Sequence, residues 1–109
     1  MKPTFYSDPG HAWLAVSRQE LIDLGILHKV SQYSYQRGEK VYLEEDCDAY
    51  LYINRCYALG KPSGFTVKNQ AHGYSRIRNY NRVSMWPHEF RQSKANEQKT
   101  DALLAEIAG

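Results

Sequence analysis

The sequence predicts an α+β fold: a small, mostly antiparallel sheet of four to five strands with two helices packed on one face. Short segments rich in β-branched and aromatic residues alternate with segments that have the 3.6-residue periodicity of a helix. Glycine and proline separate these segments, as they do at turns and helix ends. The chain has 109 residues, of which 42% are hydrophobic and 24% charged. This length and composition fit one domain with one core.

The first part of the chain predicts a turn, a strand and a helix, in that order. Asp8-Pro9-Gly10 has the residue types of a turn. Residues 11–16 then form an apolar strand. Ser17 lies three residues before a glutamate, which is the spacing of a capping box, so a helix is expected over residues 18–24. Gly25 lies where a left-handed residue ends such a helix.

The middle of the chain predicts a β-hairpin followed by a helix. Residues 33–35 and 40–44 are β-rich and flank a turn that contains glycine. A helix follows over residues 47–59, because its apolar residues recur at the spacing i, i+3, i+4, i+7. These residues are Ala49, Tyr52, Ile53 and Cys56. Gly60 provides the stop.

The last part of the chain predicts two further strands and a polar end. The strands are expected at residues 65–68 and 74–83. A single α+β domain would then span residues 1–90, and residues 91–109 would form a polar C-terminal tail or a short helix. The expected core residues are Trp13, Leu14, Leu21, Val41, Leu43, Ile53 and Cys56.

Charge and hydropathy argue against several classes of protein. The net charge of +2 is unlike that of a DNA mimic, which would be strongly acidic. No apolar run approaches the roughly 20 residues that cross a bilayer, and the N-terminus lacks the apolar stretch of a signal peptide. We therefore expect a cytoplasmic protein with no membrane partner. The two cysteines are too few for a disulfide scaffold and are expected to be free thiols.

An alternation of arginine and tyrosine marks the strand predicted at residues 74–83. In an extended segment, residues of the same parity point to one face of the sheet. Guanidinium groups and phenol rings on one face suit contacts with phosphates or carboxylates and stacking on bases. The alternative is a solvated face whose arginines pair with acids of a neighbouring strand. The residues expected on this contact face are Tyr74, Arg76, Arg78, Tyr80 and Arg82.

An acidic run lies between the predicted hairpin and the helix that follows it. Carboxylates in the first turn of a helix accept hydrogen bonds from its free N–H groups and oppose the positive end of its dipole. Capping and solubility are the first explanation, contact with a partner the second, and metal binding or acid–base chemistry the third. The run consists of Glu44, Glu45, Asp46 and Asp48.

No motif in the sequence specifies an enzyme, a cofactor or a metal site. The histidines and cysteines lack metal-ligand spacing, and there is no phosphate-binding glycine loop or nucleophile elbow. Neighbouring acids disfavour the thiolate of Cys47, which makes it a poor nucleophile. His11 would need Asp48 or Cys47 beside it to form a catalytic pair. We therefore expect no catalytic residue, no cofactor and no bound metal.

Four segments of the sequence resemble small proteins carried by bacteriophages and other mobile elements. They are DPGHAWL at residues 8–14, YSY at 33–35, VYLEEDCDA at 41–49 and SRIRNY at 75–80. The resemblance brings no catalytic residue with it. It implies a phage context, in which short proteins without enzymatic motifs inhibit or redirect host machinery, anti-CRISPR and other anti-defence proteins among them.

Three functions are open from the sequence. The first is a phage-type interaction protein that binds a host protein or protein–nucleic-acid complex and inhibits or redirects it, as an anti-CRISPR protein does. The second is direct nucleic-acid binding through the arginine–tyrosine face. The third is a small enzyme with a histidine–carboxylate site. A monomer and a homodimer are both compatible with these functions.

Overall fold

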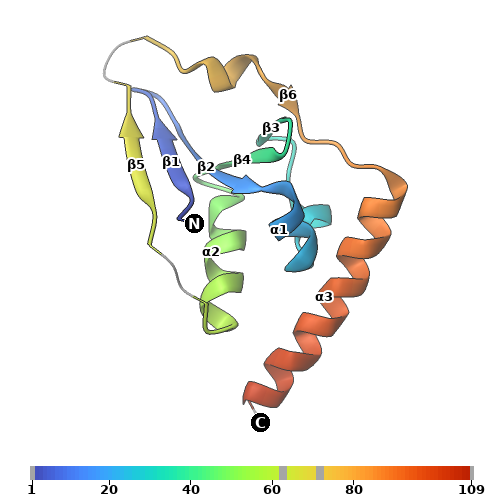
Figure 1. Ribbon diagram of the computed structural model, residues 1–109. Helices are drawn as coiled ribbons and strands as arrows, with labels where there is room; N and C mark the ends of the chain where they lie inside the picture. The colour runs from blue at the N-terminus through green and yellow to red at the C-terminus, as the bar shows by residue number, and fades with distance from the viewer. Residues whose placement is uncertain (1, 62–63, 71–72, 109) are drawn as a thin grey trace.

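The computed structural model describes residues 2–61, 64–70 and 73–108. In this part of the chain, six strands and three α-helices are joined by two short 3₁₀ helices, η1 and η2 (Figure 1). The strands are β1 (Thr4–Ser7), β2 (Ala12–Ser17), β3 (Tyr35–Arg37), β4 (Lys40–Glu44), β5 (Thr66–Asn69) and β6 (Asn81–Arg82). The helices are α1 (Arg18–Asp23), η1 (Leu27–Lys29), α2 (Ala49–Ala58), η2 (Arg76–Asn79) and α3 (Pro87–Ala108). The fold is therefore α+β, as the sequence predicts.

The strands form one mixed sheet in the order β5-β1-β2-β4-β3-β6. Four of the five strand pairs are antiparallel, and β1 pairs with β5 in parallel. The expectation of four to five strands and two helices is too low on both counts. It misses β1, which lies just before the predicted turn, and it does not count the C-terminal helix α3, which the sequence predicts only as a tail or a short helix over residues 91–109.

The turn between β1 and β2 is built on Asp8. Its backbone N–H donates to the carbonyl of His11 (2.9 Å), and its Oδ1 accepts from the N–H groups of Gly10 and His11 (3.0 Å each). An aspartate that bonds its own backbone in this way fixes a tight turn. The turn places Ser7 opposite Ala12 and so sets the register of the hairpin.

The predicted start and end of α1 are confirmed. The hydroxyl of Ser17 accepts from the N–H of Glu20 (3.4 Å), and Gly25 follows the helix with a φ of 76°. The predicted β3–β4 hairpin and the helix α2 also form. Asp48 occupies the N-cap position of α2, but its side chain caps no helical N–H group.

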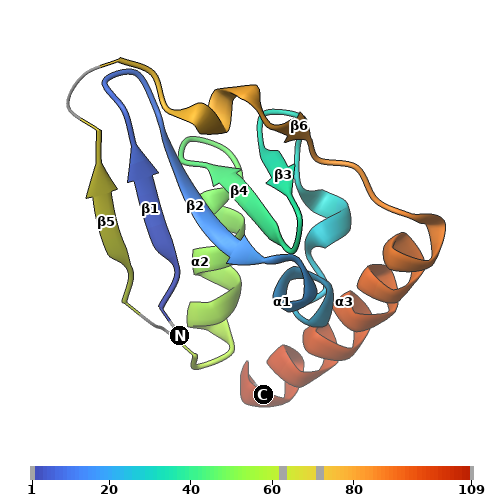
Figure 2. The same cartoon turned by 45° about the horizontal axis from the view of Figure 1, so that its top comes forward.

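The core lies between one face of the sheet and the helices α1, η1 and α2 (Figure 2). Of the seven expected core residues, six are buried, and Ile53 is partly buried against the same cluster. Trp13 is buried to 2% exposure, but it belongs to the opposite face of the sheet from Leu14, because successive strand residues alternate.

Helix α3 runs beside α1 and η1, away from the sheet (Figure 1). Polar contacts hold it there: Arg18 makes two 2.8 Å bonds to Glu89, and Arg55 pairs with Asp101 at 2.8 Å. The helix has 22 residues and begins at Pro87, so it is longer than the short helix expected after residue 90. None of the helices in the described residues is long and apolar enough to cross a membrane.

The strand predicted over residues 74–83 is wrong. Residues 76–79 form η2, and only Asn81 and Arg82 are in a strand. The hydroxyl of Ser75 accepts from the N–H of Ile77, which starts the 3₁₀ turn, and Ile77 is buried at 3% exposure. The segment has two aliphatic residues, Ile77 and Val83, which are six positions apart, so it has no continuous apolar face to bury as a strand.

Candidate functional site

The two faces of the sheet differ in chemistry. One face carries the aliphatic residues of the core. On the other, Tyr6 pairs with Trp13 and Ala15 pairs with Tyr42, and Tyr35 pairs with Tyr42 from the next strand. Paired residues of neighbouring strands share a face, so these five residues lie together. Figure 2 shows α2 behind the sheet and no described helix in front of β5, β1, β2 and β4.

Three tyrosine rings form a row across this open face. The ring centroids of Tyr6 and Tyr42 are 6.3 Å apart, and those of Tyr42 and Tyr80 are 5.2 Å apart. Strand β2 lies between the strands of Tyr6 and Tyr42, and the residue it places there is Ala15. The small side chain of Ala15 lets the two rings meet above the intervening strand. All three rings are half-buried, so each retains an accessible part. We call Tyr6, Tyr42 and Tyr80 the tyrosine row.

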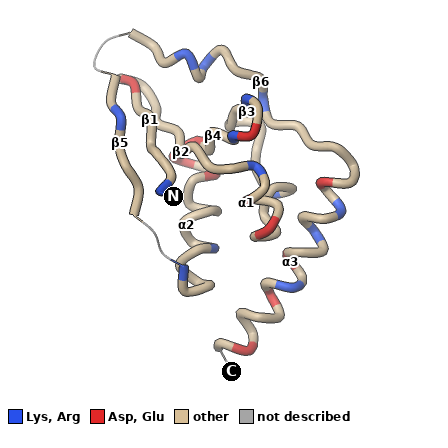
Figure 3. Tube along the Cα trace, in the orientation of Figure 1, with Lys and Arg blue, Asp and Glu red and all other residues tan. Residues whose placement is uncertain are grey.

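Exposed cations lie beside these rings. Lys68 Nζ is 5.9 Å from the ring centroid of Tyr6, and Arg37 Cζ is 5.0 Å from that of Tyr80. Both are cation–π distances. Arg82 and Lys40 project from the same face, because Arg82 pairs with Tyr35 and Lys40 is two residues from Tyr42. Figure 3 shows basic positions along β5, η2 and β6, which border the sheet.

A pocket of about 400 Å³ adjoins the tyrosine row. It shares Trp13 and Tyr35 with the open face, and Trp13 is almost wholly buried beneath it. Its lining consists of His11, Trp13, Tyr33, Tyr35, Glu44, Asp46, Cys47, Arg78 and Arg82. Four segments of the chain contribute to this lining, at residues 8–14, 33–35, 41–49 and 75–82. The fold therefore brings those four segments, which are far apart in the sequence, to one place.

An ion pair between Asp8 and Arg78 fixes one wall of the pocket. Arg78 donates from Nε and Nη2 to the two carboxylate oxygens of Asp8, each at 2.8 Å, and the Ser75 N–H donates to the same carboxylate. The Asp8 side chain is fully buried. Arg78 holds the pKa of the Asp8 carboxyl well below its usual range. The guanidinium also lies 5.3 Å from the Trp13 ring centroid, so Arg78 organises the pocket.

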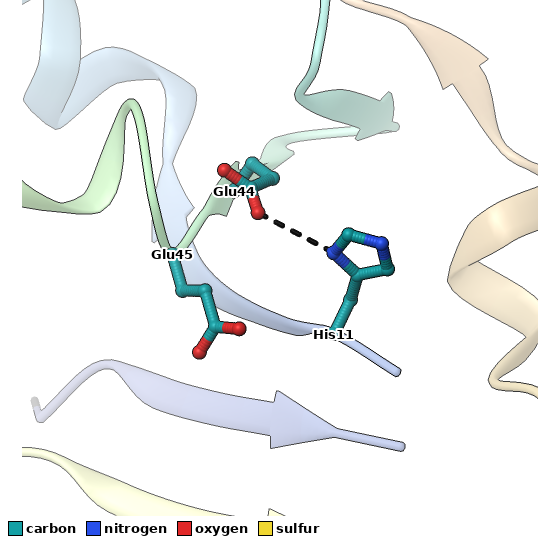
Figure 4. Close-up of side chains that lie close together, drawn as sticks. All are labelled: His11, Glu44 and Glu45. Carbon is teal, nitrogen blue, oxygen red and sulfur yellow. Dashed lines mark ion pairs between the residues drawn. The ribbon is translucent and has the colours of Figure 1, made fainter. Parts of the chain in front are cut away.

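The carboxylate that faces the imidazole of His11 is that of Glu44. His11 Nδ1 is 3.5 Å from Glu44 Oε1, and one ligand atom from each of His11, Glu44 and Glu45 lies within 4.8 Å of the others (Figure 4). The hypothesised pairing of His11 with Asp48 does not form. Asp48 instead accepts hydrogen bonds from Ser31 and from the hydroxyl of Ser34, inside the protein.

The five residues expected on one arginine–tyrosine face do not share a face. Tyr80 and Arg82 reach the open face of the sheet, and Arg78 is engaged by Asp8. Tyr74 is 76% exposed and stacks on Arg78, with 4.7 Å between its centroid and Cζ, and Arg76 is exposed on η2. The strand parity that grouped them fails because η2 turns the chain every three residues.

The acidic run is also divided by the fold. Glu44 and Asp48 are buried, Glu45 is half-buried and Asp46 is exposed. The run therefore does not form one exposed acidic patch. Burial raises the pKa of the Cys47 thiol, and the hydrogen bond and negative charge of Glu44 add to this rise. This agrees with the expectation that Cys47 is a poor nucleophile.

Sequence reasoning missed Tyr6, Arg37 and Lys68 as parts of the site. Tyr6 belongs to Thr-Phe-Tyr-Ser, a β-prone segment whose alternation is only four residues long. Lys68 reaches the face through the parallel pairing of β5 with β1, which no local pattern specifies. The sequence contains one signal for the open face. Tyr42 shares a strand face with Glu44 and not with the core residues Val41 and Leu43.

No family model matches the chain, and no curated protein or solved structure matches it significantly. The function proposed below therefore rests on the geometry of the site.

Proposed function

We propose that this protein binds single-stranded nucleic acid on the open face of its sheet. The observation that carries the proposal is the tyrosine row with cations beside its rings, on a sheet face that none of the described α-helices covers. Exposed aromatic side chains on a sheet stack against the bases of single-stranded nucleic acids. The bases of a duplex are already stacked on each other, so the row favours a single strand.

The charges of this face support a polyanionic ligand. Among the strand residues that share it, four are cations and one, Glu44, is an acid; the cations are Arg37, Lys40, Lys68 and Arg82. Glu44 lies at the pocket end and is buried, so the exposed part of the face is cationic. A base stacked on a tyrosine would place its flanking phosphates within reach of these side chains.

A protein partner is the competing hypothesis from the sequence, in the form of an inhibitor of a host complex. Contact surfaces for proteins also use tyrosine and arginine. The spacing of cations along a row of rings favours a repeating anionic ligand over a protein surface. An inhibitor that occupied a nucleic-acid channel would need an acidic surface, and the open face is not acidic.

Fluorescence anisotropy with a labelled single-stranded oligonucleotide of about 12 nucleotides tests the proposal. We expect binding to DNA or RNA single strands and weaker binding to a duplex of the same sequence. Replacing Tyr80 by alanine should weaken binding by about 1–3 kcal/mol, or roughly 5- to 150-fold, because one stacking ring is lost. Arg37→Glu should also weaken binding of the oligonucleotide.

Lys99→Glu provides the matched control, because it makes the same change of net charge as Lys68→Glu at an exposed position of α3. Lys68→Glu should weaken binding and Lys99→Glu should leave it nearly unchanged. Equal effects of the two variants would mean that the oligonucleotide binds by net charge alone. No binding of any single strand at low salt would refute the proposal and leave a protein partner as the hypothesis to pursue.

A further inference from the structure

Glu44 differs from the other buried carboxylates in how its charge is compensated. In the described residues, three carboxylate residues are buried: Asp8, Glu44 and Asp48. Asp8 accepts two bonds from Arg78 and three from backbone N–H groups, and Asp48 accepts from two serines. Such bonds offset the cost of burying a charge.

The Glu44 side chain is 8% exposed, yet it has no arginine or lysine partner in the described chain. Its Oε2 accepts from the N–H of Asp46 at 2.8 Å. Its Oε1 faces His11 Nδ1 at 3.5 Å, which is longer than an ordinary hydrogen bond. The imidazole of His11 is therefore the ion-pair partner of Glu44 in the described chain.

Glu45 brings a second carboxylate to the same space. Glu45 is half-buried, and a carboxylate oxygen of it lies within 4.8 Å of the ligand atoms of His11 and Glu44. In the described part of the chain, no lysine or arginine forms an ion pair with Glu45. Two carboxylates and an imidazole thus converge, and in the described chain neither carboxylate has an arginine or lysine in ion-pair contact.

We propose that His11, Glu44 and Glu45 bind a divalent transition-metal ion such as Zn²⁺. An imidazole nitrogen and two carboxylate oxygens are a ligand set that suits Zn²⁺ or Mn²⁺, and two carboxylates balance the charge of the ion. The ligand atoms lie within 4.8 Å of one another. Metal–ligand bonds of about 2.0–2.2 Å require them to approach to roughly 3.5 Å.

The side chains are placed so that this approach needs little movement. Glu44 is held in β4 opposite Trp13, and the Glu45 N–H donates to the carbonyl of Ala12 at 3.1 Å, so the two segments are tied together. The His11 side chain is 46% exposed, and its Nδ1 already faces the Glu44 carboxylate. Figure 4 shows the three side chains around one space, and His11 and Glu44 also line the pocket, from which the ion would enter.

Isothermal titration of the full chain, first with ZnCl₂ and separately with MnCl₂, tests the site without any nucleic acid. We expect one ion per chain for at least one metal. His11→Ala and Glu45→Gln should each lower the affinity by at least about tenfold, since each removes a ligand. Both residues are at least partly exposed, and circular dichroism of each variant checks that the fold is retained.

Two variants serve as controls. His88→Ala removes an exposed histidine at the start of α3, and Asp46→Asn removes the exposed acid next to the cluster. Both should leave the affinity within about threefold of the wild-type value. Absence of stoichiometric binding of both metals, or binding that depends on His88 and not on His11, would refute the site. Because the titration contains no oligonucleotide, its result is independent of the proposed nucleic-acid binding.

Discussion

At the scale of single residues, Ala15 controls whether the tyrosine row is continuous. Strands β1 and β4 flank β2, so their backbones are about 10 Å apart, twice the spacing of neighbouring strands. The rings of Tyr6 and Tyr42 nevertheless come within 6.3 Å of each other. Ala15 pairs with Tyr42 and is diagonal to Tyr6, and it is only 7% exposed although it faces the open side of the sheet. A larger side chain at this position would enter the space between the two rings.

We predict that Ala15→Val separates these rings and weakens oligonucleotide binding while the sheet still forms. Valine favours strands, so the backbone should tolerate it, but its extra methyl groups occupy the space between Tyr6 and Tyr42. Anisotropy should show weaker binding, by roughly tenfold, and thermal unfolding should show a change of at most about 3 kcal/mol. Unchanged affinity in a folded Ala15→Val variant would mean that bases do not stack on both rings.

At the scale of elements, Gly25 decides how closely α3 approaches α1. A Cβ at this position would lie 2.2 Å from the backbone nitrogen of Glu97, and the φ of Gly25 is 76°. We predict that Gly25→Ala displaces α3. Gly60→Ala is the matched control, because Gly60 also follows a helix with a φ of 70° but has nothing within 4 Å of its Cβ position.

The control variant should lose only the roughly 1–2 kcal/mol that an alanine costs in a left-handed conformation. Gly25→Ala should lose clearly more stability in urea, and the amides of residues 87–108 should exchange hydrogen faster. If the two variants lose the same stability, the contact with Glu97 adds nothing to the backbone strain.

The same elements show which structural features can be predicted from residues that are neighbours in the sequence. Ser17, Gly25 and the apolar spacing of α2 specify helix positions through neighbouring residues, and these predictions are confirmed. The strand over residues 74–83 fails because alternation of arginine and tyrosine says nothing about Asp8, the distant residue that binds Arg78 and Ser75. The candidate site was found in part, through Tyr80 and Arg82, because its other members depend on pairing between strands far apart in sequence.

The ion pair between Arg18 and Glu89 of α3 predicts how the stability of the protein depends on pH. The two bonds from Arg18 lower the pKa of the Glu89 carboxyl to about 2, against a value near 4.5 without them. A lowered pKa in the folded state means that this ion pair stabilises the protein above about pH 4.5 and that the contribution is lost as pH falls toward 2.

Urea unfolding of wild type and Glu89→Gln at several pH values measures this contribution. The difference in unfolding free energy should be about 2 kcal/mol near pH 7 and should shrink toward zero between pH 4.5 and pH 2. Glu106→Gln, which removes an exposed acid of the same helix, should show no such change with pH. A difference that stays constant across this range would mean that the Arg18–Glu89 pair does not form in solution.

At the scale of the whole molecule, one face of the sheet packs against the core, and the other is the proposed binding face. The aliphatic face, α1, η1 and α2 form the core cluster, while the tyrosines and cations of the open face lie outside it, and Trp13 and Ala15 are the hydrophobic residues buried on that face. The pocket lies at one end of the open face, where the turns before β2 and after β4 meet. A strand of nucleic acid lying along the tyrosine row would reach the pocket through Trp13 and Tyr35, which both regions share.

This arrangement predicts how binding depends on salt. If the four cations of the open face each contact one phosphate, the logarithm of the association constant should fall with the logarithm of salt concentration with a slope of about −3, since each contact on a single strand contributes about −0.7. The double variant Lys68→Glu, Arg37→Glu should reduce the magnitude of the slope by at least about 1.4. Tyr80→Ala should weaken binding at every salt concentration and leave the slope unchanged, because stacking releases no counterions. Anisotropy titrations across a range of KCl concentrations distinguish the two effects. A slope that changes in Tyr80→Ala but not in the double variant would contradict the assignment of stacking to Tyr80 and of phosphate contacts to the cations.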